Sequence, residues 1–117
     1  MKTNRGDVVR VLFPNSDLRT AKRRPALVIQ SDQLKTGLSQ TIVAMITSNL
    51  ANAQNPSRVL ILKTSPEGRQ SGLRLDSVIM TDNLATILET EIDSVLGSLS
   101  QQAMANVSAA LRHTLDL

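Results

Sequence analysis

The first half of the chain alternates short apolar segments with polar, turn-forming ones, and no long helix separates them. Valine, isoleucine and leucine dominate four segments that we predict to be β-strands, at residues 6–13, 25–30, 40–47 and 58–62. The first connection, 14–22, is polar and contains proline, asparagine and serine, as loops do. Parallel neighbours would need a crossover of about a dozen residues or more, usually a helix. We therefore expect a mainly β (α+β) fold, built as a small antiparallel barrel.

The second half continues this pattern less regularly. The segment "KTSPEGRQSGL" carries Pro-Glu-Gly and a second glycine, which predicts turns. Two short strands are expected after it, at 74–80 and 84–88. Residues 89–99 are ambiguous, and 94–96 could form an edge strand.

The C-terminal segment has the periodicity of an amphipathic helix. Ser98 and Gln101 have the Ser-x-x-Gln spacing of a capping box. Apolar residues then recur at helical spacing, at Met104, Val107, Leu111 and Leu115. We expect a helix over about residues 100–115 that packs on the barrel.

The composition excludes several kinds of chemistry. The 117 residues include no cysteine, so thiolate nucleophiles, thiolate metal sites and disulfides are excluded. His113 is the single histidine and lies off the apolar stripe of the expected helix, so we expect neither a metal site nor a catalytic role for it. No run approaches the roughly 20 apolar residues of a membrane helix. These features predict one cytoplasmic domain over residues 1–117, without a cofactor.

The positive charge is concentrated near the N-terminus, and its densest stretch is "AKRRPALVIQS". Residues 1–35 carry a net charge of +5, and residues 36–117 carry −2. Pro25 restricts the residue before it to extended conformations, so Arg24 should be held rigidly at the start of a strand. Lys22 and Arg23 should belong to the preceding loop. Arg24 could either serve a reaction or simply pair with a carboxylate.

Arginine, hydroxyl and carboxylate groups suit one reaction class, the cleavage of RNA, which needs neither a metal nor a cysteine. In RNA the 2′-hydroxyl is a built-in nucleophile beside the phosphate that it attacks. An enzyme must then stabilise the charge that develops on phosphorus-bound oxygens, and a fixed guanidinium can do so through paired N–H donors. Phe13 is the only Phe, Tyr or Trp residue, so stacking of bases on aromatic side chains cannot be the main way in which a single strand is bound.

Four segments, in order along nearly the whole chain, resemble the MazF/PemK family of toxin endoribonucleases. They are "RGDVVRVLF" (5–13), "RRPALVIQSD" (23–32), "VAMITS" (43–48) and "LRLDSVIMTDNLATI" (73–87). The resemblance implies an SH3-like barrel of the MazF/CcdB type, usually a homodimer. It also implies metal-independent, sequence-specific cleavage of single-stranded RNA, which leaves a 2′,3′-cyclic phosphate and a 5′-hydroxyl.

The resemblance also assigns roles to residues. By position, the catalytic arginine and threonine of the family fall on Arg24 and Thr47. Arg24 would stabilise the phosphorane and could protonate the leaving oxygen, and Thr47 would hydrogen-bond a phosphate oxygen. Around this pair, RNA-binding roles are expected for Lys22, Arg23, Ser48, Asp82 and Asn83.

Some of these roles have alternatives. Asp82 and Asn83 would read base edges, although "TDN" could equally be a β-turn. No general base is evident, and Asp17 is a candidate by its location alone.

The expected partner is an antitoxin whose acidic, disordered segment folds over the basic site. Two non-enzymatic alternatives remain on the same barrel. One is a gyrase poison like CcdB, whose C-terminal tryptophan is absent here, and the other is a degenerate, antitoxin-binding member.

Overall fold

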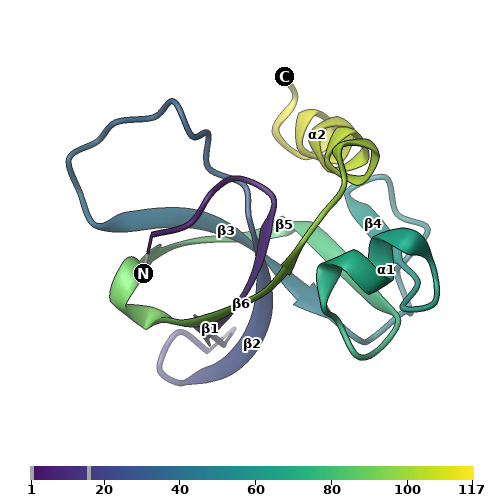
Figure 1. Cartoon of the computed structure of the whole chain (residues 1–117), viewed down its shortest axis with the longest axis horizontal. Coiled ribbons are helices and arrows are strands. Elements are labelled where there is room, and N and C mark those ends of the chain that lie inside the picture. Colours follow the sequence, from purple (N-terminus) through teal and green to yellow (C-terminus); the bar gives the residue numbers. More distant parts are fainter. Residues whose placement is uncertain (1, 16) are drawn as a thin grey trace.

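A computed structural model, which describes residues 2–15 and 17–117, shows a six-stranded antiparallel sheet that curls into a half-open barrel (Figure 1). The strand order is β4-β5-β3-β2-β1-β6. Ser16, part of the predicted first loop, lies outside the described residues. The strands are β1 (Asp7–Pro14), β2 (Ala21–Val28), β3 (Gln40–Thr47), β4 (Arg58–Ile61), β5 (Ser77–Leu88) and β6 (Ile92–Ser98).

Strand β2 begins earlier than predicted, which changes the setting of the cationic stretch. Lys22 and Arg23 lie within β2, not in a loop, because β2 pairs with β1 from Ala21 onward. Pro25 is therefore not the first residue of its strand. Strand β3 pairs with β2 only from Ala26 onward. The missing N–H of Pro25 therefore costs no hydrogen bond to β3, and the proline is tolerated there.

The two short strands predicted at 74–80 and 84–88 are one strand, β5, with an irregularity in its middle. Met80 lies opposite Met45 of β3, but the next residue pair is Leu84 with Ala44. Residues 81–83 are therefore extra on the β5 side, and they bend the strand. The alternative that "TDN" is a β-turn is wrong, because these residues belong to β5.

A short helix, α1 (Pro66–Ser71), occupies the segment predicted as turns. Ser65 caps it by accepting a hydrogen bond from Gly68, and the proline sits in the first turn, where its missing N–H costs nothing. Gly72 ends the helix at φ +75°. The helix packs closely on β6, since a Cβ at Gly97 would overlap the backbone of α1. Ser65 and Pro66 were the signals in the sequence that could have predicted this helix.

The C-terminal helix α2 (Gln101–Leu115) is confirmed, but its cap and one end of its stripe differ from the prediction. Ser100, not Ser98, is the N-cap, and it accepts from the backbone N–H of Ala103. Leu115 is half exposed rather than packed. The fully buried residues of α2 are Ala103, Val107 and Ala110, and the predicted stripe residues Met104 and Leu111 pack against the core while partly buried.

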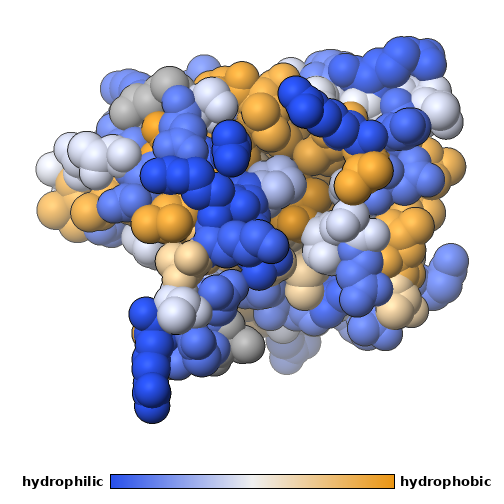
Figure 2. All heavy atoms as spheres, turned by 90° about the horizontal axis from the view of Figure 1, so that it is seen from below, coloured by the Kyte–Doolittle hydropathy of each residue, from blue (hydrophilic) through white to orange (hydrophobic). Residues whose placement is uncertain are grey.

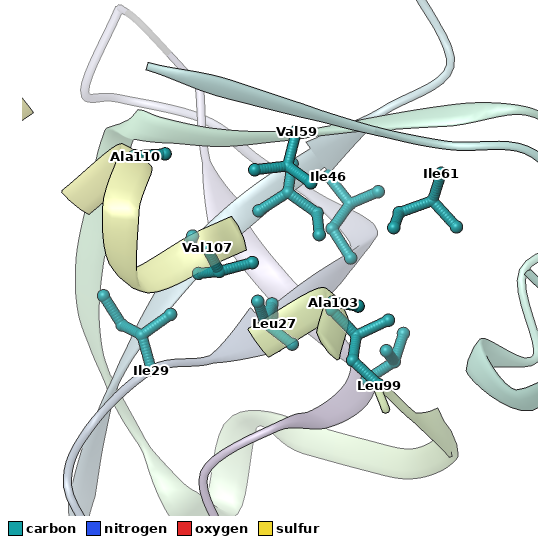
Figure 3. Close-up of a cluster of buried hydrophobic side chains, with 12 residues drawn as sticks. Leu27, Ile29, Ile46, Val59, Ile61, Leu99, Ala103, Val107 and Ala110 are labelled. Carbon is teal, nitrogen blue, oxygen red and sulfur yellow. The ribbon is translucent and has the colours of Figure 1, made fainter. Parts of the chain in front are cut away.

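Two buried clusters lie on opposite faces of the sheet. The first packs α2 against β2, β3 and β4, with Val107 among Leu27, Ile46 and other aliphatic side chains (Figure 3). The second lies inside the curl of the sheet and contains Phe13, with valines and isoleucines of β1, β2, β3, β5 and β6. Strand residues therefore alternate between the two faces.

The surface mixes hydrophilic and hydrophobic groups. On the face shown in Figure 2, hydrophilic side chains form a band across the middle, with hydrophobic patches on both sides. No helix in the described part of the chain has the length and apolar character needed to span a membrane.

Candidate active site

Arg24 lies in β2 on the same face as the second core cluster, opposite Val11 of β1. Its Nη2 donates a hydrogen bond of 3.0 Å to Oδ1 of Asn15, in the loop after β1. Its Nε is buried and has no hydrogen-bond partner within residues 2–15 and 17–117. Arg24 forms no ion pair with any residue in the described ranges, so the alternative that it simply pairs with a carboxylate finds no support. The hydrogen bond to Asn15 thus holds the guanidinium in place, while its Nε lacks an acceptor among the described residues.

Thr47 is the last residue of β3 and lies close to Arg24 in the sheet. The register of β2 and β3, in which Ala26 lies opposite Met45, would set Arg24 opposite Thr47 two residues further on. Oγ1 of Thr47 accepts a hydrogen bond of 3.1 Å from the backbone N–H of Asn49. No described residue accepts a hydrogen bond from this hydroxyl, so its hydrogen can be donated to an anion.

Two adjoining pockets share Arg24 and Thr47 in their walls. The first, called the amide pocket, has a volume of about 420 Å³. Its lining is rich in asparagine and contains no acidic residue: Pro14, Asn15, Arg24, Met45, Thr47, Asn49, Asn52, Arg58, Met80 and Asn83.

The second, called the basic pocket, has a volume of about 530 Å³. It combines cationic side chains of β1, β2 and the segment before β5 with apolar ones: Arg10, Lys22, Arg23, Arg24, Pro25, Ile46, Thr47, Ser48, Gly72, Leu73, Arg74, Leu75, Ser77 and Leu96. A phosphate bound between Arg24 and Thr47 would have one pocket on each side.

Three of the residues predicted to bind RNA line the basic pocket. They are Lys22, Arg23 and Ser48. Arg23 also forms a 2.6 Å ion pair with Asp93 of β6, so part of its charge is already neutralised. Lys22 is exposed and makes no ion pair with any described residue, which leaves its charge available to a polyanion.

Asp82 and Asn83, predicted to read bases, differ in their surroundings. Asn83 lines the amide pocket, and its Nδ2 donates to Sδ of Met45 at 3.2 Å. Asp82 is in the lining of neither pocket. Its two carboxylate oxygens accept from Nε and Nη2 of Arg58 at 3.0 and 3.1 Å, a bidentate pair.

Asp17, the candidate general base, organises the first loop instead. Its carboxylate accepts hydrogen bonds from the backbone N–H groups of Thr20 and Arg19 and from the hydroxyl of Thr20. These bonds lower the pKa of the Asp17 carboxyl below its usual value. Asp17 lines neither pocket, and a lowered pKa makes it a weaker base.

The sequence reasoning missed much of the amide pocket. Asn15 lies in the loop after β1, Met45 and Met80 come from β3 and β5, and Arg58 opens β4. Met45 and Met80 read as ordinary strand residues, and only the cross-strand register brings them together. Alternation within β3 was an available signal, because it places Met45 on the same face as Thr47. Among the described residues, no three histidine or acidic side chains gather as a metal site would require.

The sequence matches a family model described as the PemK-like, MazF-like toxin of type II toxin–antitoxin systems, over residues 4–115. Among curated proteins, the endoribonuclease MazF6 of Mycobacterium tuberculosis is 37% identical over 107 residues, which cover 91% of this chain and 90% of the relative. The endoribonuclease EndoA of Bacillus subtilis is 31% identical over 118 residues, covering 100% of this chain and 97% of the relative.

Solved structures share the fold. A crystal structure of MazF from Deinococcus radiodurans superposes with a TM-score of 0.74 at 19% identity, covering 100% of this chain and 99% of the other. A mycobacterial endoribonuclease in complex with its cognate antitoxin gives 0.75 at 19% identity, covering 99% and 97%. The predicted barrel with a C-terminal helix is therefore confirmed as the fold of these toxins.

Proposed function

The chain belongs to the family of PemK-like, MazF-like toxins of type II toxin–antitoxin systems, and from this premise we propose that it is an endoribonuclease acting on single-stranded RNA. The observation that carries the proposal is the state of Arg24. This guanidinium is held beside Thr47 at the junction of two pockets, has a buried donor without an acceptor, and has no acidic partner among the described residues. A phosphate diester would supply the missing acceptors.

The proposed reaction needs no group beyond RNA, water and the chain itself. The 2′-hydroxyl oxygen attacks the adjacent phosphorus, and the bond from phosphorus to the 5′-oxygen breaks. The products are a 2′,3′-cyclic phosphate and a 5′-hydroxyl. The 2′-hydroxyl loses one proton and the leaving 5′-oxygen gains one, so the step balances. Arg24 donates to the non-bridging oxygens as their charge grows, and the hydroxyl of Thr47 donates to one of them.

The basic pocket would hold the RNA backbone next to the scissile phosphate. Lys22 contributes a cation with no ion-pair partner in the described part of the chain, while Arg23 contributes less because Asp93 already neutralises it. Ser48 offers a hydroxyl at the same wall. Asn83 would contact a base in the amide pocket, and Asp82 would act indirectly by holding Arg58.

We also propose that an antitoxin silences this site and that the toxin acts as a homodimer in the cytoplasm. An acidic, disordered antitoxin segment fits the basic pocket because arginine and lysine side chains lie beside exposed leucines such as Leu75 there. Solved complexes of mycobacterial and Deinococcus radiodurans family members with their antitoxins support such a partner.

The test is cleavage of single-stranded RNA by the purified protein in the presence of EDTA. We expect wild type to cut, Arg24→Ala to lose at least about 100-fold in rate, and Thr47→Ala to lose less. Mapping the cut ends should show a 2′,3′-cyclic phosphate and a 5′-hydroxyl.

His113→Ala is the matched control, because this exposed side chain on α2 lies in neither pocket of the site. If wild type and Arg24→Ala leave RNA equally intact, the enzyme assignment fails. Inhibition of gyrase supercoiling without RNA cleavage would instead favour a non-enzymatic toxin on this barrel.

A further inference from the structure

Thr81, in the middle of β5, is a polar residue with no exposed surface. Its hydroxyl donates a hydrogen bond of 2.6 Å to the backbone carbonyl of Ser57, which also accepts from the N–H of Thr81 at 3.1 Å. The same hydroxyl lies 2.7 Å from Oγ1 of Thr114, in the last turn of α2. A buried hydroxyl without partners is costly, so these two hydrogen bonds make a threonine acceptable at this position.

The direction of these hydrogen bonds follows from the number of hydrogens. A hydroxyl carries one hydrogen, and that of Thr81 is donated to the carbonyl of Ser57. Thr114 must therefore donate to Thr81. Helix α2 packs on β4 and β5 (Figure 1), so the hydrogen bonds run from the end of α2 through β5 to the residue before β4.

Ser57 is the buried end of the loop that joins β3 to β4, residues 48–57. All other residues of this loop are exposed except Ala53, which is half-buried, so hydrogen bonds rather than apolar burial hold its shape. Three of its N–H groups donate to acceptors two or three residues back: Ala53 to Leu50, Asn55 to Asn52, and Ser57 to the side chain of Asn55.

The other end of the loop reaches the candidate active site. The N–H of Asn49 donates to Oγ1 of Thr47 at 3.1 Å, and Asn49 and Asn52 line the amide pocket. The loop therefore runs from the hydroxyl of Thr47 to the hydroxyl of Thr81. Thr81 itself is in the lining of neither pocket, so it can affect bound RNA only through other residues.

We propose that Thr81 is a positioning residue for RNA cleavage and that it acts by anchoring the β4 end of the 48–57 loop. With Ser57 held, the loop keeps the N–H of Asn49 on Oγ1 of Thr47, which leaves the hydrogen of that hydroxyl for a phosphate oxygen. Thr114 completes the anchor, so the last turn of α2 supports the site. This inference rests on the proposed function, because cleavage is the reaction that the anchor serves.

The activity test compares two substitutions of Thr81 with opposite effects. Thr81→Val keeps the shape and removes the hydroxyl, whereas Thr81→Ser keeps the hydroxyl and removes a buried methyl group. Thr81→Val should lower kcat about tenfold with KM within about twofold of wild type, because Thr47 acts on charge that grows in the transition state. Thr81→Ser should keep kcat within about twofold of wild type although the lost methyl group lowers its stability.

Thr41→Val is the matched control, because Thr41 is also a buried strand threonine but lines neither pocket of the site. It should keep the wild-type kcat and KM. Thr114→Val should lower kcat about threefold, since Thr81 can still donate to Ser57. The double variant of Thr81 and Thr114 should be no slower than Thr81→Val alone, because Thr114 acts only through Thr81. A double variant slowed by the product of the two single effects would remove Thr114 from the anchor.

Amide hydrogen exchange in the protein without RNA tests the anchor independently of catalysis. Followed by NMR, the N–H groups of Asn49 and Asn55 should exchange at least about threefold faster in Thr81→Val than in wild type. Exchange at both positions should be unchanged in Thr81→Ser and in Thr41→Val.

These readouts separate failure of the anchor from failure of the proposed function. If wild type cleaves RNA and Thr81→Val cleaves as fast, or Thr81→Ser is as slow as Thr81→Val, the positioning role is wrong and the nuclease stands. A slow Thr81→Val with unchanged exchange in the loop would also overturn it. If wild type cleaves nothing, the nuclease is wrong. Faster exchange in Thr81→Val alone would then keep the anchor of the loop, and unchanged exchange would overturn the anchor as well.

Discussion

Replacing Arg24 with methionine should make the protein more stable and inactive. The buried Nε without an acceptor costs about 1–3 kcal/mol, and methionine removes it while keeping most of the side-chain stem. The change also removes the hydrogen bond to Asn15, which contributes about 0.5–1.5 kcal/mol. The difference predicts a gain of about 1 kcal/mol in the free energy of unfolding.

Urea denaturation measures this gain directly, and in a domain of this size it corresponds to a rise in Tm of about 4 °C. Arg23→Met is the matched control, because it is the same change one residue earlier. It removes a partly exposed ion pair with Asp93, so it should cost about 0–1 kcal/mol. The two neighbouring arginines should therefore shift stability in opposite directions.

Activity should separate the same two variants. Arg24→Met should lose at least about 100-fold in RNA cleavage, whereas Arg23→Met should lose far less. A fall of more than about 1 kcal/mol in the stability of Arg24→Met would refute this reasoning, because it would show that the charge supports the fold. Cleavage by Arg24→Met within tenfold of wild type would refute it equally.

Three further predictions concern stability. Val107→Ala should lower the free energy of unfolding in urea by about 2 kcal/mol, because this α2 side chain is fully buried, and a loss under 0.5 would contradict the packing of α2. Asp82→Asn should cost about 1 kcal/mol, less at high salt, by removing the partner of Arg58, and a salt-independent cost would argue against an ion pair. The folded-state pKa of Asp17 is lowered, so its contribution is present above the ordinary carboxyl pKa and lost as the pH falls through the lowered value. Asp17→Asn should therefore lower stability between pH 6 and 8, where the contribution of the carboxylate is fully present, and should flatten the loss of stability below about pH 4, as acid titration of unfolding will test.

Much of the fold could be read from local pattern, because strands and helices follow residue periodicity. The third strand was predicted with its observed ends, and the apolar stripe identified α2. The errors arose where tertiary contacts override local signals. Pro25 looked like a strand start, but pairing with β1 extends β2 back to Ala21. Residues 81–83 looked like a turn, but pairing on both sides of them keeps β5 continuous.

The candidate site likewise combines features that the sequence determined with features that only the tertiary structure decided. By itself the sequence determined that this chain has no thiol, a single histidine and an arginine held by a following proline, since composition and backbone restriction need no partner. Only the tertiary structure decided that Asp82 is engaged by Arg58, that Arg24 has no acidic partner among the described residues, and that two methionines share a pocket with Thr47. Those facts depend on cross-strand register, which joins residues far apart in the chain and leaves no trace in local periodicity.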